Sequence, residues 1–117
     1  MKIDTIRELL SADVLCCEEN LGKHVYSACG CDLMSDVLAF VKDQAVLLTG
    51  LVNPQVIRTA VMMDMVCIVF VRSKTPSEEM LALARESGIV VMCTEKTLYT
   101  ACGLLYSNGL TGPGKVD

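Results

Sequence analysis

The sequence has little positive charge, few aromatic side chains and a single histidine, and these shortages exclude several classes of protein. It contains ten lysines and arginines against fourteen aspartates and glutamates, a net charge of −4, and five aromatic residues in 117. Proteins that bind nucleic acid need a basic patch, commonly interleaved with aromatic residues, and no segment of this chain has one. We therefore expect no nucleic-acid partner.

Long hydrophobic runs are also missing. The longest apolar stretch, residues 61–71, is broken by Asp64 and falls short of the roughly 20 residues that span a membrane. The first eight residues have no continuous apolar core and are typical of a helix rather than a signal peptide. We expect a cytoplasmic protein that does not bind a membrane.

Standard phosphate-binding and catalytic motifs are absent as well. Neither Gly-x-x-x-x-Gly-Lys-Ser/Thr nor Gly-x-Gly-x-x-Gly occurs, so a nucleotide-hydrolysing or dinucleotide site of the usual kind is not expected. An acid–base enzyme could use Asp32, Asp36 and His24, but no activated nucleophile or oriented base accompanies them. We expect no enzymatic activity and no cofactor, and this enzyme is the least favoured alternative.

Apolar residues, in contrast, make up 52% of the chain. A domain of 117 residues has a high surface-to-volume ratio, so it cannot bury that many apolar side chains by itself. We therefore expect a homodimer or a protein partner to cover the excess. The predicted helix 32–42 is a candidate for this contact, because its apolar arc is wider than one face of a sheet requires.

Seven cysteines are present, and most lie in apolar runs, where a reduced cysteine packs as a small hydrophobic residue. The alternative function is a redox accessory protein that binds a metal or an iron–sulfur cluster through Cys16, Cys17, Cys29 and Cys31. Their spacing does not match the paired Cys-x-x-Cys pattern of structural zinc or the ordered runs of ferredoxins. We favour buried packing and expect no metal.

Three times, an apolar strand leads through a polar turn into a helix. Uninterrupted apolar strands that alternate with helices indicate a parallel sheet covered by helices. We predict a single α/β domain over residues 1–110, with a mostly parallel sheet, helices on both faces, and a flexible tail over residues 111–117. The predicted strands are 13–17, 24–30, 45–49, 65–71 and 89–93, and the predicted helices are 3–11, 32–42, 54–63, 76–87 and 95–107.

Polar residues at the helix starts can act as N-caps or hold a ligand. Asp32, Asn53, Thr75 and Thr94 are predicted N-caps, and Pro54 is suited to the first helical position. Ligands on parallel sheets gather where strands end and helices begin, so the same turns could hold a small anion such as a nucleotide. The candidate ligand-binding residues are Thr49, Gly50, Asn53, Arg72, Ser73, Lys74 and Thr94.

Several segments resemble the DRTGG-domain family. They are residues 31–40, with the specific stretch Asp-Leu-Met-Ser-Asp-Val, residues 45–50, Asn53-Pro54, the strand at 66–71 and the last helix at 98–106. The resemblance implies a fold similar to the N-terminal domain of HPr kinase/phosphorylase and a regulatory or assembly role rather than a catalytic one. It also implies, for short stand-alone members, a hydrogenase-linked redox or signalling context. The residues that name the family do not occur at the matching strand ends, where only Gly50 corresponds.

Overall fold

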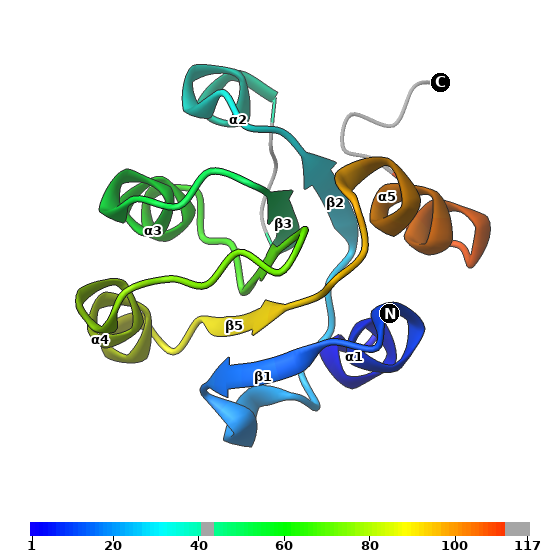
Figure 1. Ribbon diagram of the computed structural model, residues 1–117, viewed down its shortest axis with the longest axis horizontal. Coiled ribbons are helices and arrows are strands. Elements are labelled where there is room, and N and C mark those ends of the chain that lie inside the picture. The colour runs from blue at the N-terminus through cyan, green and yellow to red at the C-terminus, as the bar shows by residue number, and fades with distance from the viewer. Residues whose placement is uncertain (41–43, 112–117) are drawn as a thin grey trace.

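The computed structural model describes residues 1–40 and 44–111, which form one five-stranded sheet between two layers of helices (Figure 1). The strand order is β1-β5-β4-β3-β2, in which β2, β3, β4 and β5 run parallel and β1 runs antiparallel to β5. The mostly parallel α/β fold predicted from the sequence is therefore confirmed. The strands are β1 (Asp13–Cys16), β2 (Ser27–Gly30), β3 (Ala45–Thr49), β4 (Cys67–Phe70) and β5 (Val90–Cys93).

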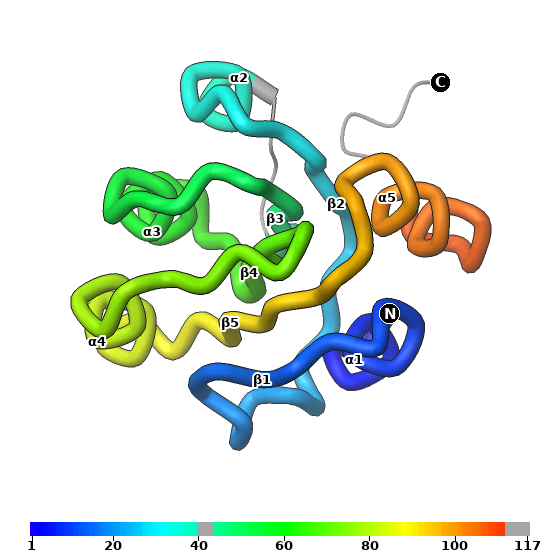
Figure 2. Tube along the Cα trace, viewed as in Figure 1, coloured from blue at the N-terminus to red at the C-terminus, as the bar shows by residue number. Residues whose placement is uncertain are grey.

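The helices lie on both faces of the sheet, as predicted. One face carries α1 (Ile3–Leu10) and α5 (Leu98–Ser107), and the other carries α2 (Met34–Phe40), α3 (Pro54–Met62) and α4 (Glu78–Ser87) (Figure 1). The trace in Figure 2 shows the short 3₁₀ helix η1 (Glu18–Asn20) in the connection from β1 towards β2. None of the described helices is long and apolar enough to cross a membrane.

The core consists of the central strands and the inner faces of the helices. All five residues of β3 and all four residues of β4 are buried, because helices cover both sides of these strands. From α1, the fully buried side chains are Ile3, Ile6 and Leu10. Burial of each such side chain contributes roughly 1.5–3 kcal/mol to folding.

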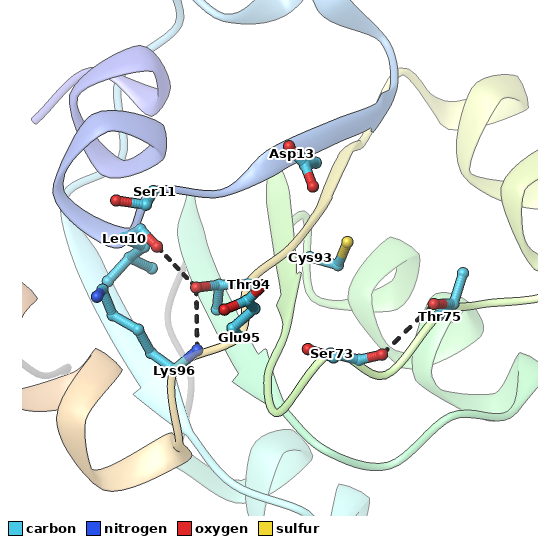
Figure 3. Close-up of a pocket in the computed structure, with 9 residues that line it drawn as sticks. All are labelled: Leu10, Ser11, Asp13, Ser73, Thr75, Cys93, Thr94, Glu95 and Lys96. Carbon is cyan, nitrogen blue, oxygen red and sulfur yellow. Dashed lines mark hydrogen bonds between the residues drawn. The ribbon is translucent and has the colours of Figure 1, made fainter.

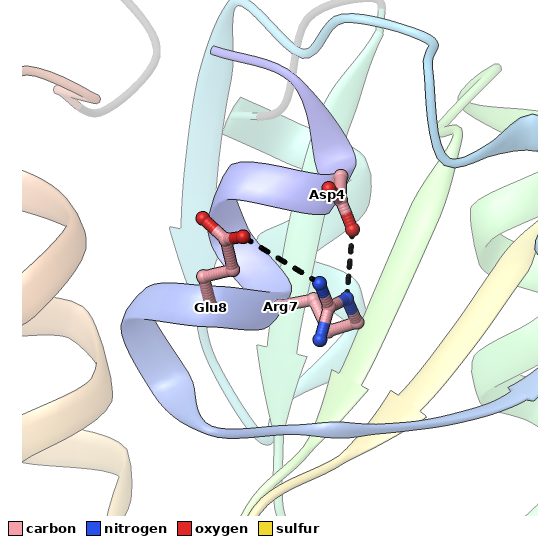
Figure 4. Close-up of polar contacts among 3 residues, drawn as sticks. All are labelled: Asp4, Arg7 and Glu8. Atoms are coloured by element: carbon pink, nitrogen blue, oxygen red, sulfur yellow. Dashed lines mark hydrogen bonds and ion pairs between the residues drawn. The ribbon is translucent and has the colours of Figure 1, made fainter.

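The outer side of α1 is polar. Arg7 Nε lies 2.7 Å from Asp4 Oδ1, and Arg7 Nη2 lies 3.7 Å from Glu8 Oε2 (Figure 4). Solvent screening leaves exposed ion pairs of this kind with little effect on stability. The position of α1 therefore depends on its apolar face rather than on these charges.

Of the four predicted N-caps, Asn53 is confirmed, and Asp32, Thr75 and Thr94 are wrong. Asn53 caps α3, with its side chain accepting from the Gln55 N–H at 2.9 Å and Pro54 following it. Helix α4 is capped by Ser77 instead of Thr75, and α5 by Thr97 instead of Thr94. Helices α4 and α5 therefore begin at Glu78 and Leu98, two and three residues later than the predicted starts at 76 and 95. The buried residues are Met80, Leu81 and Ala84 in α4, and Ala101 and Leu105 in α5.

The predicted helix 32–42 also differs from the structure. Helix α2 begins at Met34, and predicted helical residues 41 and 42 lie outside the described residues. The side chain of Asp32, the predicted cap, instead bonds to the end of β3. Thr111 is described and exposed, and the rest of the predicted tail, residues 112–117, lies outside the described residues.

Candidate ligand-binding site

The carboxyl ends of four strands meet at one edge of the sheet. Strands β2, β3, β4 and β5 are parallel neighbours, so the turns that follow them lie side by side. Because β1 is antiparallel, its amino end reaches the same edge, where Asp13 lies opposite Cys93. This polar edge is therefore built from five connections of the chain.

A pocket of about 270 Å³ lies at the ends of β4 and β5, against the start of β1 (Figure 3). Sites for drug-sized ligands commonly measure 300–1,000 Å³, so this pocket suits a phosphate or small carboxylate group rather than a whole dinucleotide. Its walls carry hydroxyls, one lysine and two carboxylates. The lining residues are Leu10, Ser11, Asp13, Ser73, Thr75, Cys93, Thr94, Glu95 and Lys96.

The turn after β4 has an uncommon backbone. Arg72 and Ser73 both have left-handed conformations, with φ of 56° and 57°. Two hydrogen bonds hold them, because Arg72 N–H donates to the Lys96 carbonyl and Ser73 N–H to the Thr94 carbonyl, each at 2.8 Å. A left-handed non-glycine residue costs about 1 kcal/mol or more, so these bonds offset strain. The side chains of all three residues of this turn, Arg72, Ser73 and Lys74, are exposed to solvent.

Thr94 has a structural role inside the pocket wall. Its side-chain hydroxyl donates to the Leu10 carbonyl at 2.7 Å and accepts from the Lys96 N–H at 3.3 Å (Figure 3). The residue is buried. The hydroxyl therefore joins the end of α1 to the turn after β5, and it has no free donor for a ligand.

The charges around the pocket are mixed. Lys96 is a cation within the lining, and Asp13 and Glu95 are carboxylates. Burial, followed by the nearby Asp13 charge, raises the pKa of the Cys93 thiol. A neutral thiol is a poor nucleophile, so this pocket is suited to binding rather than to cysteine chemistry.

The neighbouring half of the polar edge is closed by an internal carboxylate. Asp32 Oδ1 accepts hydrogen bonds from Thr49 Oγ1–H and from Gly50 N–H, both at 2.8 Å. These bonds, with a smaller contribution from the Arg72 charge, lower the pKa of Asp32 below its usual range. The Arg72 guanidinium lies next to Gly50. A Cβ atom built on Gly50 would be 3.0 Å from Arg72 Nη2. The Asp32 carboxylate thus accepts hydrogen bonds from Thr49 and Gly50, two of the residues predicted to bind an anionic ligand.

The structure divides the seven candidate ligand-binding residues into groups. Ser73 and Thr94 line the pocket, Arg72 and Lys74 are exposed beside Ser73, and Asn53 caps α3. Thr49 and Gly50 are bonded to Asp32, outside the pocket lining.

Sequence reasoning missed most of the pocket lining. Lys96 could have been predicted from the sequence, because it lies two residues after Thr94 in the turn that follows an apolar strand. Ser11 and Asp13 could not have been predicted in the same way, since their position depends on the antiparallel pairing of β1 with β5. Asp32 was assigned to helix capping, although it also follows a strand that ends at this edge.

The metal-binding alternative is wrong for the proposed set of cysteines. Cys16 and Cys17 belong to the β1 side of the sheet, and Cys29 and Cys31 to the β2 side. Four strand spacings, about 19 Å, separate these edges, so the four thiols cannot share one ion. Within residues 1–40 and 44–111, no three metal-ligating side chains are grouped to hold a metal. All seven cysteines are free thiols.

The acid–base alternative is also wrong. His24 lies before β2 and Asp32 after it, so the two side chains are at opposite ends of that strand. The His24 ring stacks on Tyr26, with ring centroids 6.3 Å apart. Asp32 is bonded to Thr49 and Gly50, and Asp36 is exposed in the first turn of α2. The three residues do not form one site.

The fold is an α/β domain whose strand ends form one polar edge with a pocket in it. The DRTGG domain family model matches residues 5–107, so the chain belongs to the DRTGG domain family. No curated protein matches the chain.

A solved structure has a similar fold: the CBS and DRTGG domains of the regulatory region of Clostridium perfringens pyrophosphatase, complexed with its activator diadenosine tetraphosphate. The identity is 21% and the TM-score 0.72, over 89% of this chain. The chain spans 45% of the length of that structure's chain.

Proposed function

We propose that this protein is a non-catalytic regulatory or interaction module that binds a small anionic ligand, such as a nucleotide, at the ends of β4 and β5. The pocket between these strand ends and the start of β1 carries this proposal. Its 270 Å³ accommodates a phosphate group, and the remainder of a nucleotide would lie across the polar edge outside it.

Three cations are available for an anion. Lys96 lies in the lining, and the exposed Arg72 and Lys74 flank Ser73. Three carboxylates lie nearby, namely Asp13 and Glu95 in the lining and Asp32 beside Arg72. The Ser73 and Thr75 hydroxyls can donate hydrogen bonds to phosphate oxygens, which fixes the orientation of the bound group.

The similar solved structure supports a regulatory role and a nucleotide. It is a regulatory region, and its complex contains a nucleotide activator. By analogy, we propose that ligand binding here changes the association of this domain with a partner. Its homodimeric state, its hydrogenase-linked redox or signalling context and its cytoplasmic location belong to the same proposal. The family resemblance supports the hydrogenase-linked redox or signalling context. The seven free cysteines support the cytoplasmic location.

Thermal unfolding with inorganic phosphate, AMP, ATP and diadenosine tetraphosphate tests the ligand proposal. A ligand at one hundred times its dissociation constant adds about 2.7 kcal/mol to the free energy of unfolding. We expect Lys96→Ala combined with Arg72→Ala to remove most of that gain, because two of the three cations are lost.

Lys23→Ala is the matched control, since Lys23 is exposed beyond the opposite end of β2. It should leave the gain unchanged. Absence of stabilisation by every compound, or equal stabilisation of the wild-type protein and the Lys96/Arg72 double variant, contradicts the proposal.

A further inference from the structure

An apolar groove lies between α3 and α4. These two helices cover the face of the sheet opposite α1 and α5 (Figure 1). Its volume is about 390 Å³, larger than the pocket at the strand ends. Unlike that pocket, it exposes mainly apolar side chains. The lining residues are Ile57, Arg58, Val61, Met62, Leu83, Glu86 and Ser87.

The apolar side chains of this groove are left over after the helices have packed on the sheet. Helix α3 buries Val56, Ile57 and Ala60, whereas Val61 and Met62 are 41% and 67% exposed. Methionine adapts its shape to a partner surface, and exposed apolar patches on small domains commonly mark interfaces. The groove is therefore suited to contact with a protein.

The groove has two charged lining residues, one positive and one negative. Arg58 belongs to α3 and Glu86 to α4, and neither forms an ion pair with another described residue. A twofold axis along the groove would place α3 of one copy over α4 of the other, because it exchanges the two sides. Each arginine would then face a glutamate of the second copy, so the surface complements itself.

We propose that the α3–α4 groove is the surface through which two copies of this chain associate, with Arg58 against Glu86 of the partner subunit. This inference rests on the homodimer in the proposed function and supplies its interface. A second copy fits better than another protein, because the groove carries both charges of the pair and an apolar strip between its helices. A stable interface of this kind buries about 800 Å² on each partner.

Charge reversal with rescue tests the interface. Sedimentation equilibrium would measure the dimer dissociation constant of the wild-type protein, Arg58→Glu, Glu86→Arg and the double variant. Each single variant should weaken the dimer at least tenfold, because like charges then meet twice across the twofold axis. The double variant should return to within about threefold of wild type, since opposite charges face each other again.

Two more variants define the surface. Met62→Lys puts an unpaired charge among the apolar residues and should leave a folded monomer at micromolar concentration. Tyr99→Glu should have no effect, because Tyr99 is 90% exposed on α5, on the opposite face. Circular dichroism and thermal unfolding would verify that every variant is folded.

The possible failures are distinguishable. A dimeric wild-type protein whose dissociation constant is unchanged by the groove variants, or a double variant without rescue, overturns this interface and leaves the homodimer standing. A monomeric wild-type protein overturns both. Ligand-induced thermal stabilisation of the same samples tests the ligand proposal separately.

Discussion

The two halves of the polar edge carry similar residues but differ in what those residues contact. At the ends of β2 and β3, the Thr49 hydroxyl and the Gly50 N–H are both bonded to Asp32. At the ends of β4 and β5, hydroxyls and a lysine surround an open pocket. The polar groups of a strand-end turn are thus free for a ligand only where no side chain of the protein is already hydrogen-bonded to them.

The difference arises from the residues that approach each half. Asp32 follows β2, which lies beside β3, so its carboxylate reaches donors that a ligand would otherwise use. The other half borders β1, whose antiparallel direction brings the Ser11 region to the edge. Thr94 fixes that border by its hydrogen bond to the Leu10 carbonyl.

The largest expected difference between the halves is in stability. Asp32→Ala should lower the free energy of unfolding by about 1.5 kcal/mol, because it leaves the buried Thr49 hydroxyl and the Gly50 N–H without their acceptor. Glu95→Ala, in the open half, should change it by less than about 0.5 kcal/mol. Urea unfolding measures both. Equal losses of unfolding free energy in the two variants would show that the hydrogen bonds of Asp32 do not stabilise the protein more than Glu95 does.

A smaller effect is expected at the border of the pocket. Thr94→Val keeps the side-chain shape but removes the hydroxyl that bonds to the Leu10 carbonyl and the Lys96 N–H, at a cost of about 1 kcal/mol. Thr75→Val is the control in the same pocket, because Thr75 is exposed and its hydroxyl bond to the Ser73 carbonyl is long, at 3.5 Å. If Thr75→Val destabilises the protein as much as Thr94→Val does, the hydrogen bonds of the Thr94 hydroxyl make no special contribution to stability.

The smallest effect is a pH dependence of the closed half. Since the folded state lowers the pKa of Asp32, its carboxylate contributes stability above the ordinary pKa of about 3.9. That contribution disappears as the pH falls through the lowered pKa. Because Asp32 is exposed, the contribution should be below about 1 kcal/mol. The difference in unfolding free energy between wild type and Asp32→Asn should shrink from pH 5 to pH 2, and a constant difference contradicts this assignment.

The fold was predictable because its signals are local. The buried apolar strands, such as Ala45–Thr49, stand out in the sequence, and Asn53-Pro54 carries both a cap and a suitable first residue. The segment from Thr75 to Glu78 contains two possible caps, and local rules do not choose between them. The structure uses Ser77, and Met80 and Leu81 in the following helix are buried.

The site was less predictable because its contacts span the chain. The hydrogen bond of Thr94 to Leu10 joins residues 84 positions apart and depends on where α1 and β1 pack. The bond between Asp32 and Gly50 depends on β2 being the neighbour of β3. The sequence indicates that these residues lie near strand ends, and only the sheet order determines which of them meet.

The reversed direction of β1 has a consequence for fragments and permuted forms of the protein. Residues 73–96 contribute one side of the pocket, and the other side comes from Leu10, Ser11 and Asp13, some sixty positions earlier. A truncated form that starts after β1 would retain the four parallel strands and their connections. It would open the cavity to water on that side, so a shortened domain that still folds is the wrong reagent for ligand screening.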